Sequence, residues 1–240
     1  MDLKQRCNGI FECSDGSDET DCNPLVINKE NYRKIFPPRI NEHKAKIAVN
    51  MDISSIKNID EPDMSFNADL KIDLTWSDHR IMFKNLAEKG NFLEKAWHDQ
   101  IWLPPLIFSN TEEIVHVSAE DSIGVKIIKQ QDSPVPNNLK EFNEGNTFSG
   151  DQNELVLFAH HHYNFHCPFE LSRFPFDIQN CSIDIQIPDE IKDYITLDPK
   201  NLEYSGKYNR HVLFKAVFKR KSFDLHITVK TDVAKYKFNI

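Results

Sequence analysis

The feature that most constrains this fold is an alternation of apolar and polar side chains, with a period of two residues, which dominates the chain from Lys46 onward. Such a period indicates β-strands, because successive side chains of a strand point to opposite faces. In Phe66–Trp76 one face would carry Phe66, Ala68, Leu70, Ile72 and Leu74. Further strands are predicted at Ala48–Ile53, Val115–Val117, Gly124–Ile128, Glu154–Phe165, Ser182–Ile187, His211–Phe218, Leu225–Val229 and Val233–Ile240.

Residues that favour turns separate the predicted strands. Many short strands joined in this way are typical of an all-β protein, and we expect an antiparallel β-sandwich. Before the strands, Asn28–Phe36 is predicted to form one short helix, which Pro37 and Pro38 would end. The predicted turns lie at Asn58–Pro62, Ser133–Asn138, Glu144–Asp151, Pro188–Asp189 and Asp198–Asn201.

The composition argues against several functional classes. The net charge of -8 is unlike that of a nucleic-acid-binding protein, which usually carries a basic patch. Only 7 glycines are present, with no Gly-rich phosphate motif and no Gly-x-Ser-x-Gly or His-Glu-x-x-His motif, so we expect no enzyme. No apolar run reaches the roughly 18 residues that would predict a membrane span. The start of the chain lacks the apolar core of a secretory signal, so a secreted protein would have lost its signal peptide.

Five cysteines fall into two groups, with Cys7, Cys13 and Cys22 close together and Cys167 and Cys181 far along the chain. This spacing favours disulfides over a single zinc site, which needs closely spaced pairs of ligands. The triplet Asn180-Cys181-Ser182 is an acceptor sequence for N-glycosylation and favours the secretory pathway.

The segment between Cys167 and Cys181 carries the most informative motif. Phe174-Pro175-Phe176-Asp177 lies near its centre. A disulfide that closes a loop of about 15 residues removes about 3 kcal/mol of loop entropy from the unfolded state. An exposed aromatic-proline-aromatic tip is a docking surface more often than a core element. The spacing alone leaves open whether this segment is a docking loop or a hairpin that only stabilises the sandwich.

This segment resembles the signature loop of the Cys-loop receptors, which are pentameric ligand-gated ion channels. Other matches occur in the expected order, in Trp76–Arg80, in Ile101–Pro104 and at Asn110. The resemblance covers about residues 28–240 and implies an extracellular ligand-binding domain at 24–240. That domain would be a twisted, immunoglobulin-like antiparallel sandwich of about ten strands with a short N-terminal helix. It would assemble as a pentamer with four further, identical subunits.

The resemblance also implies a membrane context. Four transmembrane helices would follow Ile240, which would place this domain on the extracellular side of the cell membrane, and Asn180 would carry a glycan. Ligand binding would favour one conformation, and two elements would then press on the membrane domain. These elements are the tip formed by Phe174, Pro175 and Phe176 and the turn at Asp60 and Glu61.

In this family, agonists bind between neighbouring subunits in a box of aromatic side chains, which attract ammonium groups. The resemblance, carried over one position at a time, places Ser109, Pro188 and Lys71 where aromatic residues would stand. The box is therefore largely missing, and a lysine would repel a cation. We expect a neutral or anionic small-molecule ligand rather than a simple amine. The other positions of the site fall on Val156, Phe158, Phe223 and Lys230, whereas Trp76 and Trp102 are predicted to pack in the core.

Residues 1–23 form an acidic unit with almost no apolar residues, which cannot build a core of its own. Its pattern from Cys7 to Cys22 resembles the second half of a low-density-lipoprotein-receptor class A repeat. That resemblance implies a disulfide between Cys7 and Cys22 and a partner for Cys13 upstream of residue 1. It also implies a calcium site, because the matching side chains are rich in oxygen. These side chains belong to Asn8, Glu12, Asp18 and Glu19. A disordered acidic leader is the alternative interpretation.

Four histidines form a last group, His160, His161, His162 and His166. On a strand, His160, His162 and His166 share one face. Histidines two residues apart lie about 7 Å apart, close enough to share a zinc or copper ion. They also titrate near neutral pH. The alternative is a set of partly exposed strand histidines without a ligand.

Three functions remain open at this point. The first is the extracellular domain of a pentameric ligand-gated channel, and the second is a soluble pentameric binding protein of the same fold. The third is a secreted, calcium-dependent adhesion module in which residues 1–23 are the active part. No cofactor is expected other than calcium in residues 1–23, and no nucleic acid is expected as a partner.

Overall fold

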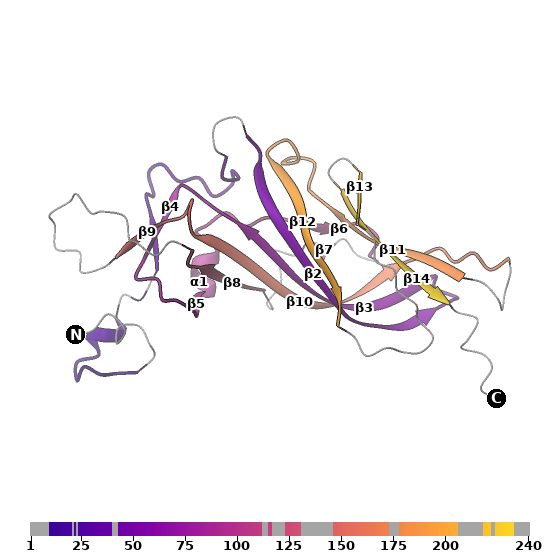
Figure 1. Ribbon diagram of the computed structural model, residues 1–240, viewed down its shortest axis with the longest axis horizontal. Helices are drawn as coiled ribbons and strands as arrows, with labels where there is room; N and C mark the ends of the chain where they lie inside the picture. Colours follow the sequence, from indigo (N-terminus) through magenta and orange to yellow (C-terminus); the bar gives the residue numbers. More distant parts are fainter. Residues whose placement is uncertain are drawn as a thin grey trace. The chain divides into compact units, whose positions relative to one another are not determined.

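The computed structural model describes residues 10–20, 22, 24–39, 43–111, 115–116, 123–130, 146–172, 178–205, 218–221 and 224–232. The chain divides into two compact units, and Figure 1 labels most of their strands. The first unit contains Met1–Ile40, Thr75–Trp102 and Gly124–Val156. The second unit contains Asn41–Leu74, Leu103–Ile123 and Leu157–Ile240.

The first unit is built from short strands. β1 (Leu25–Ile27), β4 (Ile81–Lys84) and β9 (Thr147–Ser149) form an antiparallel sheet in that order. β5 (Asn91–Leu93) pairs antiparallel with β8 (Ile123–Ile128), which neighbours β10 (Glu154–His166). Among the described residues, helix is limited to a 3-10 turn at Ser17–Glu19 and to α1 (Lys95–His98).

The second unit contains two sheets. In one, β12 (Ile195–Tyr204), β2 (Ala45–Asp60), β3 (Ser65–Trp76) and β10 are neighbours in that order. The other runs in the order β13 (Phe218–Lys221), β14 (Asp224–Asp232), β11 (Ile178–Gln186), β6 (Ile107–Phe108) and β7 (Val115–His116).

The two sheets of the second unit pack against each other through aromatic rings. Phe108 on β6 lies with its ring centroid 4.6 Å from that of Tyr163 and 5.6 Å from that of Phe165, both on β10. Phe66 on β3 packs on Phe165 at 5.5 Å. The predicted all-β sandwich is therefore confirmed, with fourteen strands in the described residues rather than about ten.

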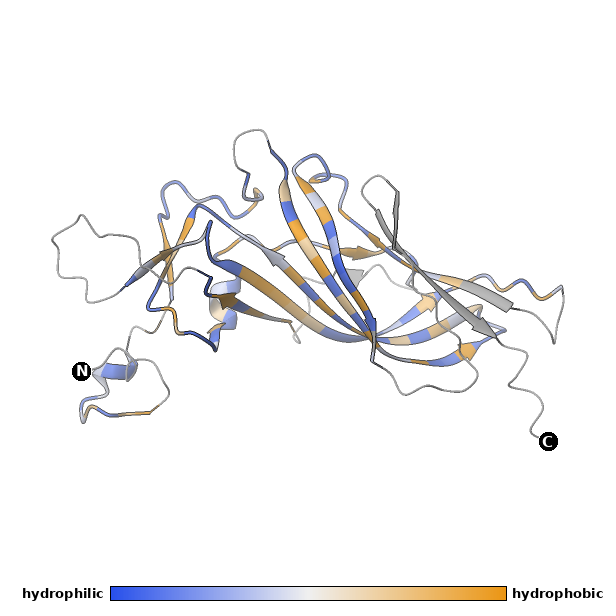
Figure 2. Cartoon of the chain, in the orientation of Figure 1, coloured by the Kyte–Doolittle hydropathy of each residue, from blue (hydrophilic) through white to orange (hydrophobic). Residues whose placement is uncertain are grey.

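The alternation of the sequence decides which side chains are buried. The apolar residues of β3, from Phe66 to Leu74, are all buried, and the polar residues between them are not. Figure 2 shows the same alternation along β2 and β12. In the first unit, Trp76 and Trp102 are buried and meet edge to face with ring centroids 6.1 Å apart. Their predicted place in the core is confirmed.

The predicted helix at Asn28–Phe36 is wrong, because turns occupy this segment. The Asn28 side chain accepts a hydrogen bond from the backbone N–H of Glu30, which caps a turn in competition with a helix. Ile35 and Phe36 are exposed, so the segment has no buried apolar stripe that could stabilise so short a helix.

The predicted turn at Asp198–Asn201 is also wrong, because these residues lie within β12. Pro199 is tolerated there because β12 is the edge strand of its sheet and the pairing register shifts between Pro199 and Asn201. β12 pairs with β2 in parallel, so the sandwich is not wholly antiparallel as predicted. Part of the predicted turn at Glu144–Asp151 is likewise the strand β9. Predictions at 117, 133–138, 211–217 and 233–240 lie outside the described residues.

Candidate functional site

The second unit presents a polar face on the sheet of β2, β3 and β10. Asp69 and Lys71 alternate with the buried residues of β3, and the exposed His160 and His162 alternate with residues of β10 that point to the core. The neighbouring strand β2 contributes further charged and hydroxyl groups. We use the term polar face for the side chains of Asp52, Ser55, Lys57, Asp69, Lys71, His160 and His162.

Asp69 is the centre of this polar face. Its Oδ1 lies 2.5 Å from Nδ1 of His162, and its Oδ2 accepts hydrogen bonds from the Ser55 hydroxyl and from Nζ of Lys57 at 3.3 Å. The hydrogen bonds from Ser55 and His162 hold the pKa of Asp69 well below its usual range. Sequence reasoning identified His162 but missed Asp69 and Ser55, although the polar positions of β3 could have indicated Asp69.

Asp52 on β2 holds a second group of contacts. It accepts hydrogen bonds from the backbone N–H of Ser205 at 3.0 Å and from the Ser205 hydroxyl at 2.7 Å. Nζ of Lys71 lies 3.7 Å from Oδ2 of Asp52. Lys71 is thus a cation opposed by a nearby carboxylate, which weakens the repulsion of a positively charged ligand that the sequence suggested.

The predicted ligand-binding residues are not all brought together. Ser109 is exposed after β6, and its backbone N–H donates to the carbonyl oxygen of Asp184 at 3.0 Å. Pro188 follows the end of β11, just after the residues of that strand that pair with β6. Phe158 is half-buried, and Val156 is 2% exposed, so the Val156 side chain offers almost no surface to a ligand.

The predicted disulfide between Cys167 and Cys181 is present, and Asn110 lies beside it. Nδ2 of Asn110 donates to the carbonyl oxygens of Ser182 at 2.7 Å and His166 at 3.3 Å. Its Oδ1 accepts from the backbone N–H of Asp184 at 2.9 Å. One amide side chain therefore connects the end of β6 with both β10 and β11.

The turn between β2 and β3 contacts the start of the disulfide loop. Glu61 and Met64 lie in this turn, whereas Asp60 is the last residue of β2, so the turn predicted at Asn58–Pro62 begins only after Asp60. The carbonyl oxygen of Met64 accepts a hydrogen bond from the backbone N–H of Cys167 at 2.6 Å. The thioether sulfur of Met64 accepts one from the backbone N–H of Phe169 at 3.2 Å. Sequence reasoning missed Met64, since nothing in its local pattern indicates a contact with residues so far along the chain.

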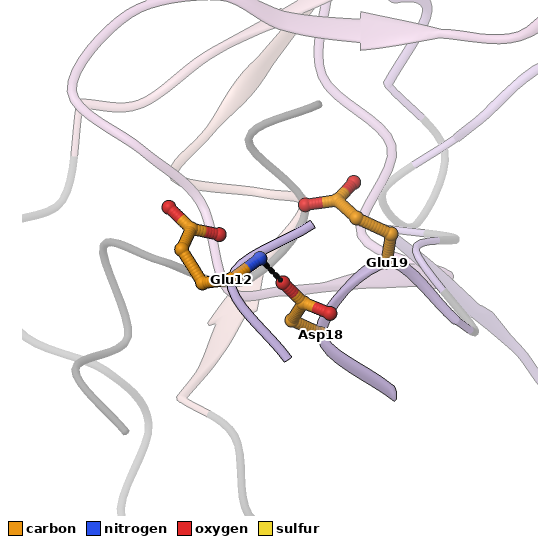
Figure 3. A group of neighbouring side chains, drawn as sticks. All are labelled: Glu12, Asp18 and Glu19. Atoms are coloured by element: carbon orange, nitrogen blue, oxygen red, sulfur yellow. Dashed lines mark hydrogen bonds between the residues drawn. The ribbon is translucent and has the colours of Figure 1, made fainter. Parts of the chain in front are cut away.

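In the first unit, Glu12, Asp18 and Glu19 place carboxylate oxygens within 4.8 Å of one another (Figure 3). Asp18 is fully buried, and its Oδ2 accepts hydrogen bonds from the backbone N–H groups of Glu12 and Cys13 at 2.5 and 3.2 Å. Burial disfavours the charged form of Asp18, but these backbone donors outweigh it and lower the pKa. The other oxygen, Oδ1, is buried and accepts no hydrogen bond within the described part of the chain. A cation is the group that such an oxygen suits.

Several predicted residues fall where little or nothing is described. Cys7, Asn8, Phe174, Pro175, Phe176 and Phe223 lie outside the described residues. Cys22 is disulfide-bonded. Asn180 and Lys230 are described by their backbones alone and pair with each other across β11 and β14.

Comparison with protein families gives a match over residues 25–234 to the family described as "Neurotransmitter-gated ion-channel ligand binding domain". The match begins after the acidic segment 1–23 and leaves that segment unassigned. Among the described residues, no helix has the length and apolar character that a membrane crossing requires.

Individual relatives are similar over the central part of the chain. The gamma-aminobutyric acid receptor subunit pi of Bos taurus is 24% identical over 157 residues, which are 65% of this chain and 30% of that protein. The gamma-aminobutyric acid receptor subunit rho-2 of Mus musculus is 20% identical over 162 residues, 67% of this chain and 30% of that protein. The acetylcholine-gated chloride channel subunit acc-2 of Caenorhabditis elegans is 27% identical over 168 residues, 69% of this chain and 32% of that protein. The chain thus spans about a third of the length of these relatives.

Proposed function

Since this chain belongs to the family of neurotransmitter-gated ion-channel ligand-binding domains, we propose that it is the extracellular ligand-binding part of a ligand-gated ion channel subunit. The observation that carries this proposal is the family match over residues 25–234, which includes the Cys167–Cys181 disulfide between the two sheets. The relatives named above are receptor and channel subunits rather than enzymes. The native protein would continue into transmembrane helices and would lie in the cell membrane.

The first experiment reads the native transcript past the codon for Ile240 and expresses the full protein in cells under voltage clamp. We expect four apolar segments of about 20 residues each and currents that depend on an applied ligand. A stop codon soon after Ile240 would instead support a soluble binding protein of the same fold.

We propose that five identical copies assemble and that the ligand binds between neighbours. Native mass spectrometry of the secreted chain tests this assembly, and a five-fold mass supports it. A monomer at all concentrations would contradict assembly by this part of the protein alone.

The ligand is proposed to be neutral or to carry a carboxylate, because Ser109, Pro188 and Lys71 do not offer an aromatic ring to an ammonium group. The names of the relatives point to two probes, gamma-aminobutyric acid and acetylcholine. Asp52 opposes the charge of Lys71, so the proposed ligand preference rests on the missing aromatic rings rather than on that charge. Titration calorimetry with both probes is the test. Tighter binding of acetylcholine would refute the proposed preference.

Signal transmission is proposed to pass through the turn of Asp60 and Glu61 and through the disulfide loop with its tip at Phe174–Phe176. The two hydrogen bonds of Met64 to the start of the loop support this route, because they tie the turn to the loop. In the full protein, Phe176→Ala should leave ligand affinity largely unchanged and abolish the currents. Loss of binding with preserved gating would contradict the route.

We further propose that Glu12, Asp18 and Glu19 bind calcium, together with Asn8. The buried Oδ1 of Asp18 and the nearby glutamates support this site, since calcium prefers six to eight oxygen ligands. Calorimetry with CaCl₂ should show one site that Glu19→Gln weakens at least tenfold, whereas Glu30→Gln, outside the cluster, should change nothing. An unchanged isotherm for Glu19→Gln would refute it.

A further inference from the structure

We propose that Met64, in the turn between β2 and β3, is a site of reversible oxidation by a peroxide, and that conversion of its thioether to a sulfoxide releases the turn from the start of the disulfide loop. The described part of the chain contains three methionines. Met51 is 3% exposed, whereas Met64 and Met82 are half-buried. Peroxide from solvent should therefore react with Met64 and Met82 before Met51, because a closely packed core excludes it.

The sulfur of Met64 takes part in the contact that oxidation would break. Its Sδ accepts a hydrogen bond from the backbone N–H of Phe169 at 3.2 Å, a contact between residues 105 positions apart. A thioether sulfur is a weak acceptor. On the other side of this contact, Phe169 is 8% exposed and the disulfide-bonded Cys167 is 2% exposed. A half-buried sulfur thus holds a buried segment, so the contact can be reached from solvent and its loss affects the packed part of the loop.

The backbone of Met64 is held in place independently of its side chain. Its φ of 50° lies in the left-handed region, which a residue with a Cβ keeps only when its surroundings hold it there. Its N–H donates to the carbonyl oxygen of Glu61 at 3.3 Å, and its own carbonyl oxygen accepts from the N–H of Cys167 at 2.6 Å. The Asp60 side chain also accepts from the N–H of Asp63 at 3.1 Å. Oxidation should therefore change the contact of the sulfur without unfolding the turn.

The reaction is a two-electron oxidation of the sulfur. A lone pair of Sδ attacks one oxygen of hydrogen peroxide, the O–O bond breaks, and an S–O bond forms. The departing hydroxide takes up the proton of the transferred oxygen and leaves as water, so the peroxide gains the two electrons that the sulfur loses. The product is polar and chiral at sulfur, and reductases that each act on one epimer convert it back to the thioether.

The sulfoxide cannot keep the hydrogen bond from Phe169 to sulfur, because the sulfur becomes the positive end of the S–O dipole and repels the N–H. The new oxygen also has no room between the two atoms. They are 3.2 Å apart, whereas an N–H···O bond alone spans about 2.7–3.2 Å. The peroxide must therefore approach the lone pair of Sδ that does not face Phe169. We expect one sulfoxide epimer to predominate for this reason.

The test is treatment of the chain with hydrogen peroxide, followed by peptide mass spectrometry to locate the sulfoxides and by hydrogen exchange of the backbone amides. Oxidation of Met64 should speed exchange of the Phe169 amide about 3–10-fold, the factor expected for one lost hydrogen bond. Met64→Leu has a similar volume and no sulfur, so its Phe169 amide should exchange fast before treatment and not change further. Met82→Leu is the matched control, because Met82 is a half-buried methionine on β4 of the first unit, and it should respond like the parent chain.

The consequence for signalling rests on the function proposed above, whereas the exchange measurement does not. In the full protein under voltage clamp, peroxide should lower the ligand-evoked current of the parent and of Met82→Leu. The current of Met64→Leu should not fall further on treatment. Currents that ignore peroxide while the Phe169 amide responds would refute the proposed transmission route alone.

Reversal of the oxidation needs no variant and keeps the test decisive if Met64→Leu does not fold. Of the two stereospecific methionine sulfoxide reductases, one should restore slow exchange at Phe169 and the other should not. Equal reversal by both would show that the N–H of Phe169 does not shield the sulfur. If Met64 stays reduced while Met82 is fully oxidised, or if its oxidation leaves the exchange of Phe169 unchanged, the proposed site does not exist.

Discussion

Replacement of Tyr32 by phenylalanine should destabilise the first unit much more than the loss of one exposed hydroxyl. The Tyr32 hydroxyl donates to Oδ2 of Asp78 at 3.2 Å and accepts from the backbone N–H of Trp102 at 2.8 Å. Both partners are buried, with Asp78 0% and Trp102 4% exposed. Tyr32→Phe therefore leaves one buried donor without its acceptor and removes one donor from a buried carboxylate.

The magnitude follows from what each partner retains. The Trp102 N–H has no replacement for its acceptor, and a buried unsatisfied donor costs about 1–3 kcal/mol. Asp78 keeps three hydrogen bonds from Arg80, at 2.7, 2.8 and 3.0 Å, so its loss is near the low end of about 0.5–1.5 kcal/mol. The guanidinium of Arg80 lies 4.5 Å from the centre of the Tyr32 ring, a contact that phenylalanine preserves. The expected loss is about 1.5–3.5 kcal/mol in total.

Urea unfolding followed by tryptophan fluorescence measures this loss directly, because Trp76, Trp97 and Trp102 all lie in the first unit. The midpoint should fall while the m-value is unchanged. Repeating Tyr32→Phe in an Asp78→Asn background serves as the control. Tyr32→Phe still removes the hydrogen bond to Trp102 in that background, so most of the loss in unfolding free energy should persist. A loss below about 0.5 kcal/mol, or one that vanishes in that background, would refute the reasoning.

Burial, followed by the charge of Asp78, raises the pKa of Tyr32. The stabilisation by Tyr32 is therefore complete below about pH 10 and is lost as the pH rises further. Between pH 9 and pH 11, the free energy of unfolding should fall less in Tyr32→Phe than in the parent chain. Replacement of both Cys167 and Cys181 by serine should lower the unfolding free energy by about 3 kcal/mol, and equal stability under reducing and oxidising conditions would contradict this. Asn110→Ala loses three hydrogen bonds and should cost about 2–4 kcal/mol in urea unfolding, whereas a neutral result would show that water replaces them. Gly150→Ala should cost about 1–3 kcal/mol or more in thermal unfolding, since a Cβ there would lie 2.4 Å from the carbonyl oxygen of Asp78, and a neutral variant would show that this backbone yields.

The sequence predicted the parts of this protein that depend on local pattern. The alternation from Phe66 to Leu74 identified the buried face of β3, because strand geometry fixes the face of every side chain once the period is known. The spacing of Cys167 and Cys181 and the motifs around Trp76 and Trp102 identified the family that the comparison then matched. Very short strands such as β1 and β9 escaped prediction, because three residues cannot show a period.

Period alone could not reveal which strands are neighbours or in what register. The contact between Asp69 and His162 joins residues 93 positions apart, and it exists because β3 and β10 pair with those two residues side by side. The parallel pairing of β12 with β2 similarly places Ser205 against Asp52, 153 positions away. The sequence by itself thus determined the fold class and the face on which each side chain lies. Only the tertiary structure decided which side chains meet across that face, because register is set by the packing of the whole sandwich rather than by any single strand.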